Sequence, residues 1–252
     1  MYRPLNCIAL RTVRYSDRNS ILSVYTLQQG RMSLLVPAGT GKAAARLRAL
    51  LMPLGRFDCI ADIRNGRDIH TFRDVRPVVL PPASDPLRAS IAMFVTDMLT
   101  ALLREAQEDA PLFGYVDRAL RRLACTERIG SRGAERPLPA SSLSNFHICF
   151  LIRLTRFLGI EPDWGSYAPG RVLDLPGGVF RAVPPPHRRF LPPGEAAAAF
   201  QLGRMNFRNM GRFCMNRFER NTILDRILLY YQTHYPSLPE PSSLEILRMM
   251  AD

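Results

Sequence analysis

The pattern of apolar residues changes abruptly at residues 81–86, and this change constrains the fold more than any other feature. Before it, short apolar runs of strand length alternate with turn signals. After it, apolar residues recur with the 3.6-residue period of a helix. Within it, Asp85 before Pro86 is a typical helix start. The sequence therefore predicts an α+β fold, with a β domain over residues 1–80 and a helical domain over residues 81–252.

The β domain contains strand-like runs with one helical run among them. Asn65-Gly66 separates the last two runs, as in a β-hairpin. The helical run, Lys42–Leu51, lies between the third and fourth strands and ends before Pro53. This order is that of an OB-fold barrel, a common platform for single-stranded nucleic acid. The predicted strands cover Leu5–Val13, Ile21–Tyr25, Ser33–Val36, Leu54–Ile63 and Ile69–Leu80.

The helical domain is expected to be all-α apart from one insert. Leu143–Leu158 is apolar on nearly all faces, which predicts a buried central helix. Residues 160–193 are rich in proline and glycine, and short apolar pieces around Pro176–Gly178 predict a small inserted β-hairpin. The sequence Ser242–Glu245 predicts a capping box at the start of a final helix. Further helices are predicted over Ile91–Leu103, Pro111–Leu123, Gly194–Gly203, Asn206–Phe218 and Asn221–Tyr235.

The positive charge is concentrated in the β domain. The chain carries a net charge of +12, and all but one of its 34 basic residues are arginine. Residues 1–80 hold 13 basic and 5 acidic residues, a net +8, whereas the remaining 172 hold 21 and 17, a net +4. Such a field attracts polyanions, most often nucleic acid. A solvated basic surface without a specific role is the alternative.

Many of these basic residues fall in predicted turns and loops, where guanidinium groups can bind phosphates or stack on bases. Four aromatic residues of the same domain are either stacking surfaces or core residues: Tyr15, Tyr25, Phe57 and Phe72. The candidate DNA-binding residues are Arg11, Arg14, Arg18, Arg31, Lys42, Arg46, Arg48 and Arg56.

The only lysine follows a glycine loop that partly matches a nucleotide-binding P-loop. A P-loop would require glycine at position 36 and a hydroxyl residue at position 43, where the chain has Val36 and Ala43. Since these two positions serve phosphate wrapping and Mg²⁺ binding, the P-loop interpretation fails. We instead expect Gly39 and Gly41 to make this loop mobile and Lys42 to contact the phosphates of a DNA backbone.

No residue pattern typical of an enzyme or a metal site is found. The five cysteines are far apart and form no CxxC pair, which favours neither a disulfide framework nor a zinc site. The histidines are isolated, and His147 is expected to be a satisfied core residue. We therefore expect no catalytic residue, metal or cofactor. The absence of a membrane-spanning or signal segment predicts a cytoplasmic protein.

Four segments occur in a characteristic order along the chain. They are YSDRNSILSVYTLQQGRMSLLVPAGTGKAAARLRALLMPL, FLIRLTRFLGIEPDW, VLDLPGGVF and HYPSLPEPSSLEILRMM. Together they resemble the bacterial recombination-repair family RecO, and the third resembles the insert of Bacteroidetes-type members. Their order and spacing, rather than any single segment, carry the resemblance.

The resemblance implies an OB fold followed by a helical domain. It implies binding of single- and double-stranded DNA, strand annealing, and partnership with RecR and in some pathways RecF. It also implies docking on the acidic, Phe-ended tail of single-strand-binding protein (SSB), so that RecA is loaded. Many members carry a four-cysteine zinc module. This chain has no cysteine between Pro162 and Cys214, so we expect no zinc there and Pro-rich packing in its place.

An acidic, aromatic tail would need an apolar cleft edged by arginine. The candidates in the helical domain, which are otherwise solvated or structural arginines, are Arg118, Arg121, Arg122, Arg153 and Arg156. The resulting prediction is a non-enzymatic, nucleoid-associated mediator of DNA repair and homologous recombination. Two alternatives stay open: an RNA- or tRNA-binding OB-fold protein, and a hydrolase or nucleotidyl transferase acting on nucleic acid.

Overall fold

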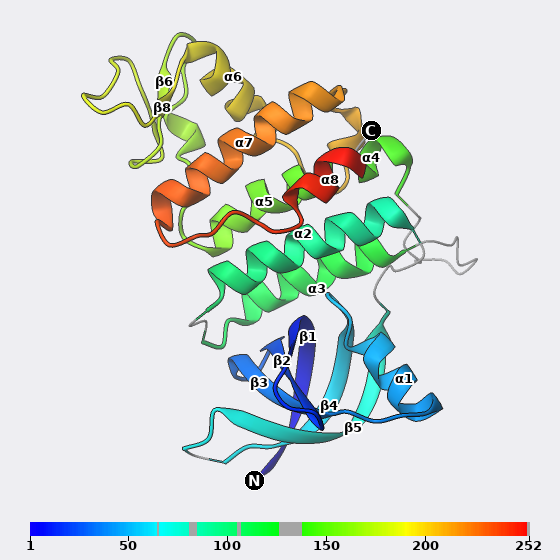
Figure 1. The fold of residues 1–252 in the computed structure, drawn as a ribbon. Coiled ribbons are helices and arrows are strands. Elements are labelled where there is room, and N and C mark those ends of the chain that lie inside the picture. Colours follow the sequence, from blue (N-terminus) through cyan, green and yellow to red (C-terminus); the bar gives the residue numbers. More distant parts are fainter. Residues whose placement is uncertain (65, 81–84, 105–106, 126–137, 251–252) are drawn as a thin grey trace. The chain divides into compact units, whose positions relative to one another are not determined.

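The computed structural model describes residues 1–64, 66–80, 85–104, 107–125 and 138–250 (Figure 1). Contacts group the chain into two compact units, of which the first contains residues 1–138 and 241–250 and the second residues 139–240. The predicted linker lies outside the described residues at positions 81–84, as does Asn65 of the predicted hairpin turn. The predicted domain boundary after residue 80 stays a prediction.

The first unit begins with a closed β-barrel, which confirms the predicted architecture. The strand order is β1-β2-β3-β5-β4, with β3 and β5 parallel and the other pairs antiparallel. One helix, α1, lies between β3 and β4 in sequence, as in an OB fold. The elements are β1 (Tyr2–Arg14), β2 (Asn19–Thr26), β3 (Gly30–Pro37), α1 (Lys42–Leu50), β4 (Arg56–Asp62) and β5 (Ile69–Val79).

Alternate residues of the strands fill the barrel. In β1 these are Leu5, Cys7 and Ala9, all buried, because successive side chains of a strand point to opposite faces. Leu47 of α1 and Leu51 just after it pack against the same core. The helix is thus anchored to the barrel by its apolar side, and its basic side faces solvent.

Two long helices, α2 (Pro86–Leu102) and α3 (Ala110–Ala124), follow the barrel in the first unit. The predicted start of α2 is confirmed, since the Asp85 carboxylate accepts from the Arg88 backbone N–H at 3.1 Å. The predicted apolar stripe is buried at Ile91, Phe94 and Met98. Burial of this stripe, rather than helix propensity, fixes α2 in place.

The short final helix of this unit, α8 (Leu244–Met250), does not begin with the predicted capping box. The hydroxyls of Ser242 and Ser243 donate to the Asp97 carboxylate of α2 at 2.9 and 2.7 Å. Glu245 pairs with Arg248 instead. A charge-assisted bond to a carboxylate is stronger than a bond to a backbone amide, so tertiary contact replaces local capping.

The second unit is built on α5 (Phe146–Phe157), preceded by the single-turn helix α4 (Ala140–Leu143). Almost all of α5 is buried, as predicted for the central helix. The Tyr231 hydroxyl of α7 (Arg217–His234) donates to the Leu151 carbonyl of α5 at 2.8 Å. A capping box between Asn216 and Glu219 starts α7 four residues earlier than predicted.

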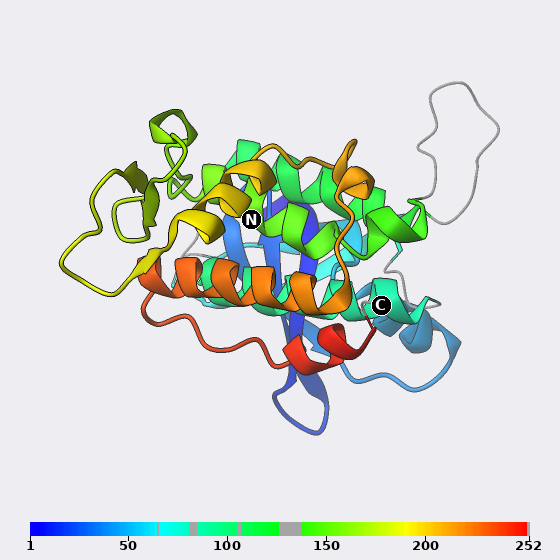
Figure 2. The same cartoon turned by 90° about the horizontal axis from the view of Figure 1, so that it is seen from above.

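The helix predicted over residues 206–218 is wrong. Between α6 (Pro193–Leu202) and α7 the chain is irregular, with only a 3₁₀ turn, η2 (Met210–Arg212) (Figure 2). The Asn206 side chain accepts from the Arg208 and Asn209 amides, at 2.9 and 3.2 Å. Such side-chain bonds offer the backbone an alternative to helical bonding, and asparagine favours turns for this reason.

The insert contains the predicted hairpin, β6 (Val172–Asp174) with β7 (Val179–Arg181), and a strand that was not predicted, β8 (Phe190–Leu191). The expected Pro-rich packing is wrong. Most prolines of the insert are exposed, whereas Phe180 packs against Trp164 and Tyr167, with ring centroids 6.2 and 5.2 Å apart. Aromatic rings stabilise the insert because they bury far more apolar area than proline. A 3₁₀ turn, η1 (Trp164–Ser166), precedes the sheet.

Candidate nucleic-acid interface and apolar pocket

Two loops of the barrel meet and bring predicted DNA-binding residues together. The Ala38 amide, after β3, donates to the Arg18 carbonyl, in the β1–β2 turn, at 2.7 Å. The Arg48 guanidinium of α1 donates to the Gly39 carbonyl at 2.8 Å. Arg18, Arg48 and the start of α1 at Lys42 therefore border one loop, residues 38–41.

The basic side chains around this loop are exposed. Arg14 pairs with Asp17 at 2.6 Å, but both side chains are so exposed that such a pair contributes little. Arg18, Lys42 and Arg46 form no ion pair with any residue that the structure describes. The exposed members of the predicted set, which we call the barrel patch, are Arg11, Arg14, Arg18, Lys42, Arg46 and Arg48.

The glycines of the loop have structural roles. Gly41 precedes α1 with φ 103°, in a region that residues with side chains rarely adopt. A Cβ on Gly39 would lie 2.8 Å from the Ala44 Cβ, which is too close. No described side chain caps α1, so the amides of its first turn face outward without a side-chain acceptor. Helix N-termini of this kind favour anions.

Two of the predicted DNA-binding residues, Arg31 and Arg56, are engaged inside the first unit. The Arg31 guanidinium donates to the Thr100 carbonyl of α2 at 2.6 Å, and burial lowers its pKa. Arg56 is 7% exposed, bonds to Asp58 and Asp117 at 2.7 and 3.0 Å, and lies over the Phe113 ring. Both arginines fasten the barrel to the helices of their unit, so we leave them out of the barrel patch.

The ion pair also sets the acidity of Asp58. Burial alone raises the pKa of this carboxyl, but hydrogen bonds from Arg56 and Asn6 outweigh burial and lower it. Asp58 is therefore held in its charged form by internal partners.

Only one of the four aromatic candidates presents a largely open ring. Tyr25 and Phe57 are fully buried core residues, and Phe72 is partly buried against the barrel core. Tyr15, between Arg14 and Arg18, is 64% exposed. This position suits base stacking beside phosphate contacts.

The five arginines predicted to bind the SSB tail do not come from one unit. Arg118, Arg121 and Arg122 lie on α3 of the first unit, whereas Arg153 and Arg156 lie on α5 of the second. Arg121 pairs with Asp117 at 2.8 Å. The Arg153 guanidinium donates to the Met205 and Gly203 carbonyls at 2.7 and 3.1 Å and so has a structural role.

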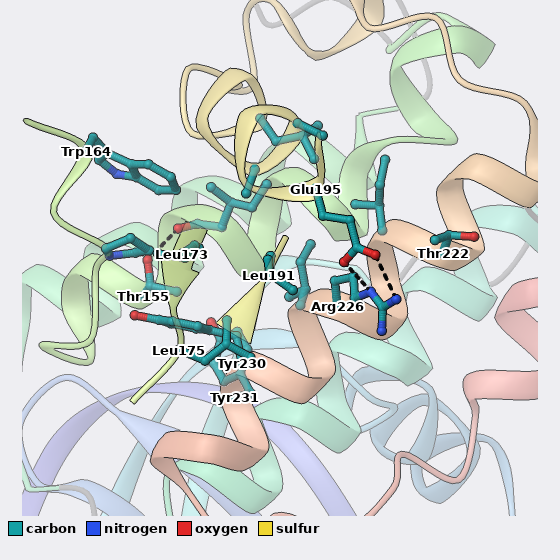
Figure 3. Close-up of a pocket in the computed structure, with 17 residues that line it drawn as sticks. Thr155, Trp164, Leu173, Leu175, Leu191, Glu195, Thr222, Arg226, Tyr230 and Tyr231 are labelled. Atoms are coloured by element: carbon teal, nitrogen blue, oxygen red, sulfur yellow. Dashed lines mark hydrogen bonds and ion pairs between the residues drawn. The ribbon is translucent and has the colours of Figure 1, made fainter. Parts of the chain in front are cut away.

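The second unit contains an apolar pocket of about 170 Å³. Its lining comes from α5, α6, α7 and the insert, and Figure 3 shows Trp164, Leu191 and Tyr230 around it. The Tyr230 hydroxyl donates to the Ile160 carbonyl at 2.7 Å, so the polar end of this ring is satisfied. The lining surface of the pocket is almost entirely apolar.

One charged pair lies among the residues lining this pocket. Arg226 and Glu195 form a two-pronged ion pair, with nitrogen–oxygen distances of 2.7 and 2.9 Å (Figure 3). The sequence interpretation named neither residue. The four-residue spacing of Thr222, Arg226 and Tyr230 on one face of α7 was an available signal, but the partner elements of that face come from distant parts of the chain.

The side chains that could bind a metal ion do not gather at one place in the described part of the chain. No three His, Cys, Asp or Glu residues within the described ranges are grouped closely enough to hold a metal ion. His147 is buried as predicted, and burial lowers its pKa to about 3. The predicted satisfaction of its hydrogen bonds is wrong for one ring nitrogen, because Nδ1 is buried and makes no hydrogen bond with any residue that the structure describes. None of the described helices is long and apolar enough to span a membrane.

Comparison with known proteins matches both parts of the chain to one family. The family model for the N terminus of recombination protein O matches residues 2–80, and that for its C terminus matches residues 83–244. A protein of Phocaeicola vulgatus named DNA repair protein RecO is 35% identical over 244 residues, covering 96% of this chain and 95% of that protein. Proteins of the same name from Bacteroides fragilis and Porphyromonas gingivalis are 33% and 31% identical, with 97% of each chain covered.

Proposed function

This chain belongs to the RecO family of DNA repair proteins, and from that premise we propose that it is a non-enzymatic mediator of DNA repair and recombination. In this proposal it binds single- and double-stranded DNA, anneals complementary strands and, with RecR and in some pathways RecF, helps RecA to load onto SSB-coated DNA. Annealing needs charge neutralisation and closely held strands, so it requires no catalytic group. A cytoplasmic, nucleoid-associated location is part of the proposal.

The observation that carries this proposal is the barrel patch. All six of its side chains are exposed, and Arg18, Lys42 and Arg48 border one loop beside a helix N-terminus that has no side-chain cap. Guanidinium groups and helix amides both bind phosphate, and Tyr15 adds a stacking surface. We propose that a DNA backbone crosses the Ala38–Gly41 loop.

The test measures single-stranded DNA binding and strand annealing by Lys42→Ala/Arg46→Ala, which replaces two exposed residues that form no ion pair within the described part of the chain. Arg188→Ala/Arg189→Ala, in an exposed loop of the insert, removes the same charge and serves as the control. We expect the first variant to bind single-stranded DNA at least tenfold more weakly and the control to behave as wild type. If both variants lose the same DNA affinity, the barrel patch contributes only through its net charge and is not a specific binding site.

Two further measurements on the wild-type protein separate the alternative functions. A clear preference for structured RNA over single-stranded DNA would favour the RNA- or tRNA-binding alternative. Turnover of labelled oligonucleotides with Mg²⁺ or Zn²⁺ would favour the hydrolase or transferase.

We further propose that the SSB tail binds in the pocket of the second unit. An apolar cavity of about 150 Å³ can hold benzene, so this pocket has room for a phenyl ring. Arg226 lies among the lining residues, where a terminal carboxylate could replace Glu195 as its partner. Ala199→Phe would fill the pocket, and Arg226→Ala would remove the cation. Both variants should lose the tail peptide and keep DNA binding, and tail affinity unchanged in both would refute this placement.

A further inference from the structure

A second basic surface lies in the second unit, outside the barrel patch and the pocket lining. From Ala196 to Phe218 the chain contains four arginines and no acidic residue. All four arginines are exposed, and Phe218 beside the last is 79% exposed. We call these five residues the helical-unit patch: Arg204, Arg208, Arg212, Arg217 and Phe218.

Two buried or half-buried side chains of the α5 region hold the backbone beneath this patch. Arg153 donates to the Gly203 and Met205 carbonyls, at 3.1 and 2.7 Å. Further along the segment, the side-chain amide of Asn145 donates to the Met210 and Phe213 carbonyls, at 3.0 and 2.8 Å. Each bond is made to a backbone carbonyl of the irregular segment, so this segment has a defined path.

Within residues 204–212, buried apolar side chains alternate with exposed arginines. Met205 and Met210 are fully buried, and the Phe207 ring lies 5.1 Å from that of Phe146. Arg204, Arg208 and Arg212, spaced by four, alternate with these buried residues and remain exposed. A fixed backbone lowers the entropy cost of binding, because only the side chains must be ordered.

Three arginines of this patch are available to a ligand. Arg204, Arg208 and Arg212 form no ion pair with any residue in the described part of the chain. The first acid after the segment, Glu219, is engaged in the capping box of α7. No internal ion pair would have to break before these arginines met an anion.

We propose that the helical-unit patch is a second binding site for single-stranded DNA, with Phe218 stacking on a base. The inference rests on the proposed function. An extended polyanion fits better than an acidic peptide because the charges are spread along the segment, and none of these residues lines the apolar pocket. With the barrel patch, one molecule would hold two strands, which is what annealing requires.

The test counts DNA strands bound by the full-length protein. A fluorescent 15-nucleotide poly(dT) is titrated at low salt into wild type, Arg204→Ala/Arg208→Ala/Arg212→Ala and Lys42→Ala/Arg46→Ala. We expect two oligonucleotides per wild-type chain and one per chain in each variant. The annealing rate of the triple variant should fall at least tenfold. In wild type, the slope of log affinity against log salt at the second site should have a magnitude of at least about 2, since each of three single-strand contacts contributes about 0.7.

The controls separate this inference from its premise. Arg204→Lys/Arg208→Lys/Arg212→Lys keeps the charge and should bind two strands, which also checks the fold. One strand per wild-type chain, or a triple alanine variant that still binds two and anneals normally, would overturn the inference. A triple alanine variant that loses the SSB tail peptide but not DNA would overturn it as well. A wild-type protein that binds no DNA would instead refute the proposed function.

Discussion

Replacing Arg56 with alanine separates a stabilising role of this arginine from a DNA-binding role. Its side chain is 7% exposed, and its guanidinium bonds to Asp117 at 3.0 Å, to Asp58 at 2.7 Å and to the Phe57 carbonyl at 2.7 Å. Alanine would leave two carboxylates without this partner. Each keeps a second donor, Arg121 for Asp117 and Asn6 for Asp58.

The expected cost follows from these contacts. Removing one partner of a buried ion pair costs about 3–5 kcal/mol. Because both carboxylates keep a donor and Asp58 is 42% exposed, we expect the lower end, about 3 kcal/mol in the free energy of unfolding. For a unit of this size that corresponds to a fall in Tm of about 6–12 °C.

The assay compares Arg56→Ala with Arg46→Ala, an exposed arginine of the barrel patch. Thermal and urea unfolding should show the loss for Arg56→Ala only, and DNA binding of the folded protein should fall for Arg46→Ala only. If Arg56→Ala unfolds like wild type but binds DNA about tenfold more weakly, the assignment of Arg56 to the interior is refuted.

Three further outcomes are expected. In Lys42→Ala/Arg46→Ala the slope of log affinity against log salt should fall by about 1.4, from two lost contacts of about 0.7 each, and an unchanged slope in a salt titration would contradict phosphate binding there. Gly41→Ala should cost about 2 kcal/mol because φ is 103° at this position, whereas Gly194→Ala, at a helical position with open space around its Cβ, should lose no stability in urea. His147 stays neutral in the folded protein down to pH about 3 but gains a proton near pH 6.5 when unfolded, so unfolding free energy should fall by about 1.4 kcal/mol per pH unit as pH decreases between these values. His147→Gln should flatten that dependence in pH-dependent unfolding curves, and an unaltered curve would argue against a buried neutral imidazole.

The barrel was predictable because its information is local. Alternating apolar residues such as Leu5, Cys7 and Ala9 identify a strand with one buried face, and the order of strands and helix then selects the topology. The helix predicted at 206–218 failed for an equally local reason. The Asn206 and Asn209 side chains bond to nearby amides, and a hydropathy pattern does not register such bonds.

The candidate site was less predictable because identical residue types have different surroundings. Arg46 and Arg56 both follow small loops of the barrel, but Arg56 meets Asp117, which is 61 positions away in sequence. Its burial therefore depends on how α3 packs, and a short stretch of sequence around Arg56 carries no information about that packing. The Glu195–Arg226 pair was missed for the same reason, since its partners lie 31 positions apart on different helices.

The clasp of Asp97 by Ser242 and Ser243 has a consequence for synthesis on the ribosome. The second unit is encoded between the two parts of the first, so residues 139–240 emerge before α8 does. Units tend to fold as their sequences become available. The side of α2 that carries Asp97 therefore stays uncovered until the whole second unit has been synthesised. A segment that follows the second unit in the sequence completes the first unit.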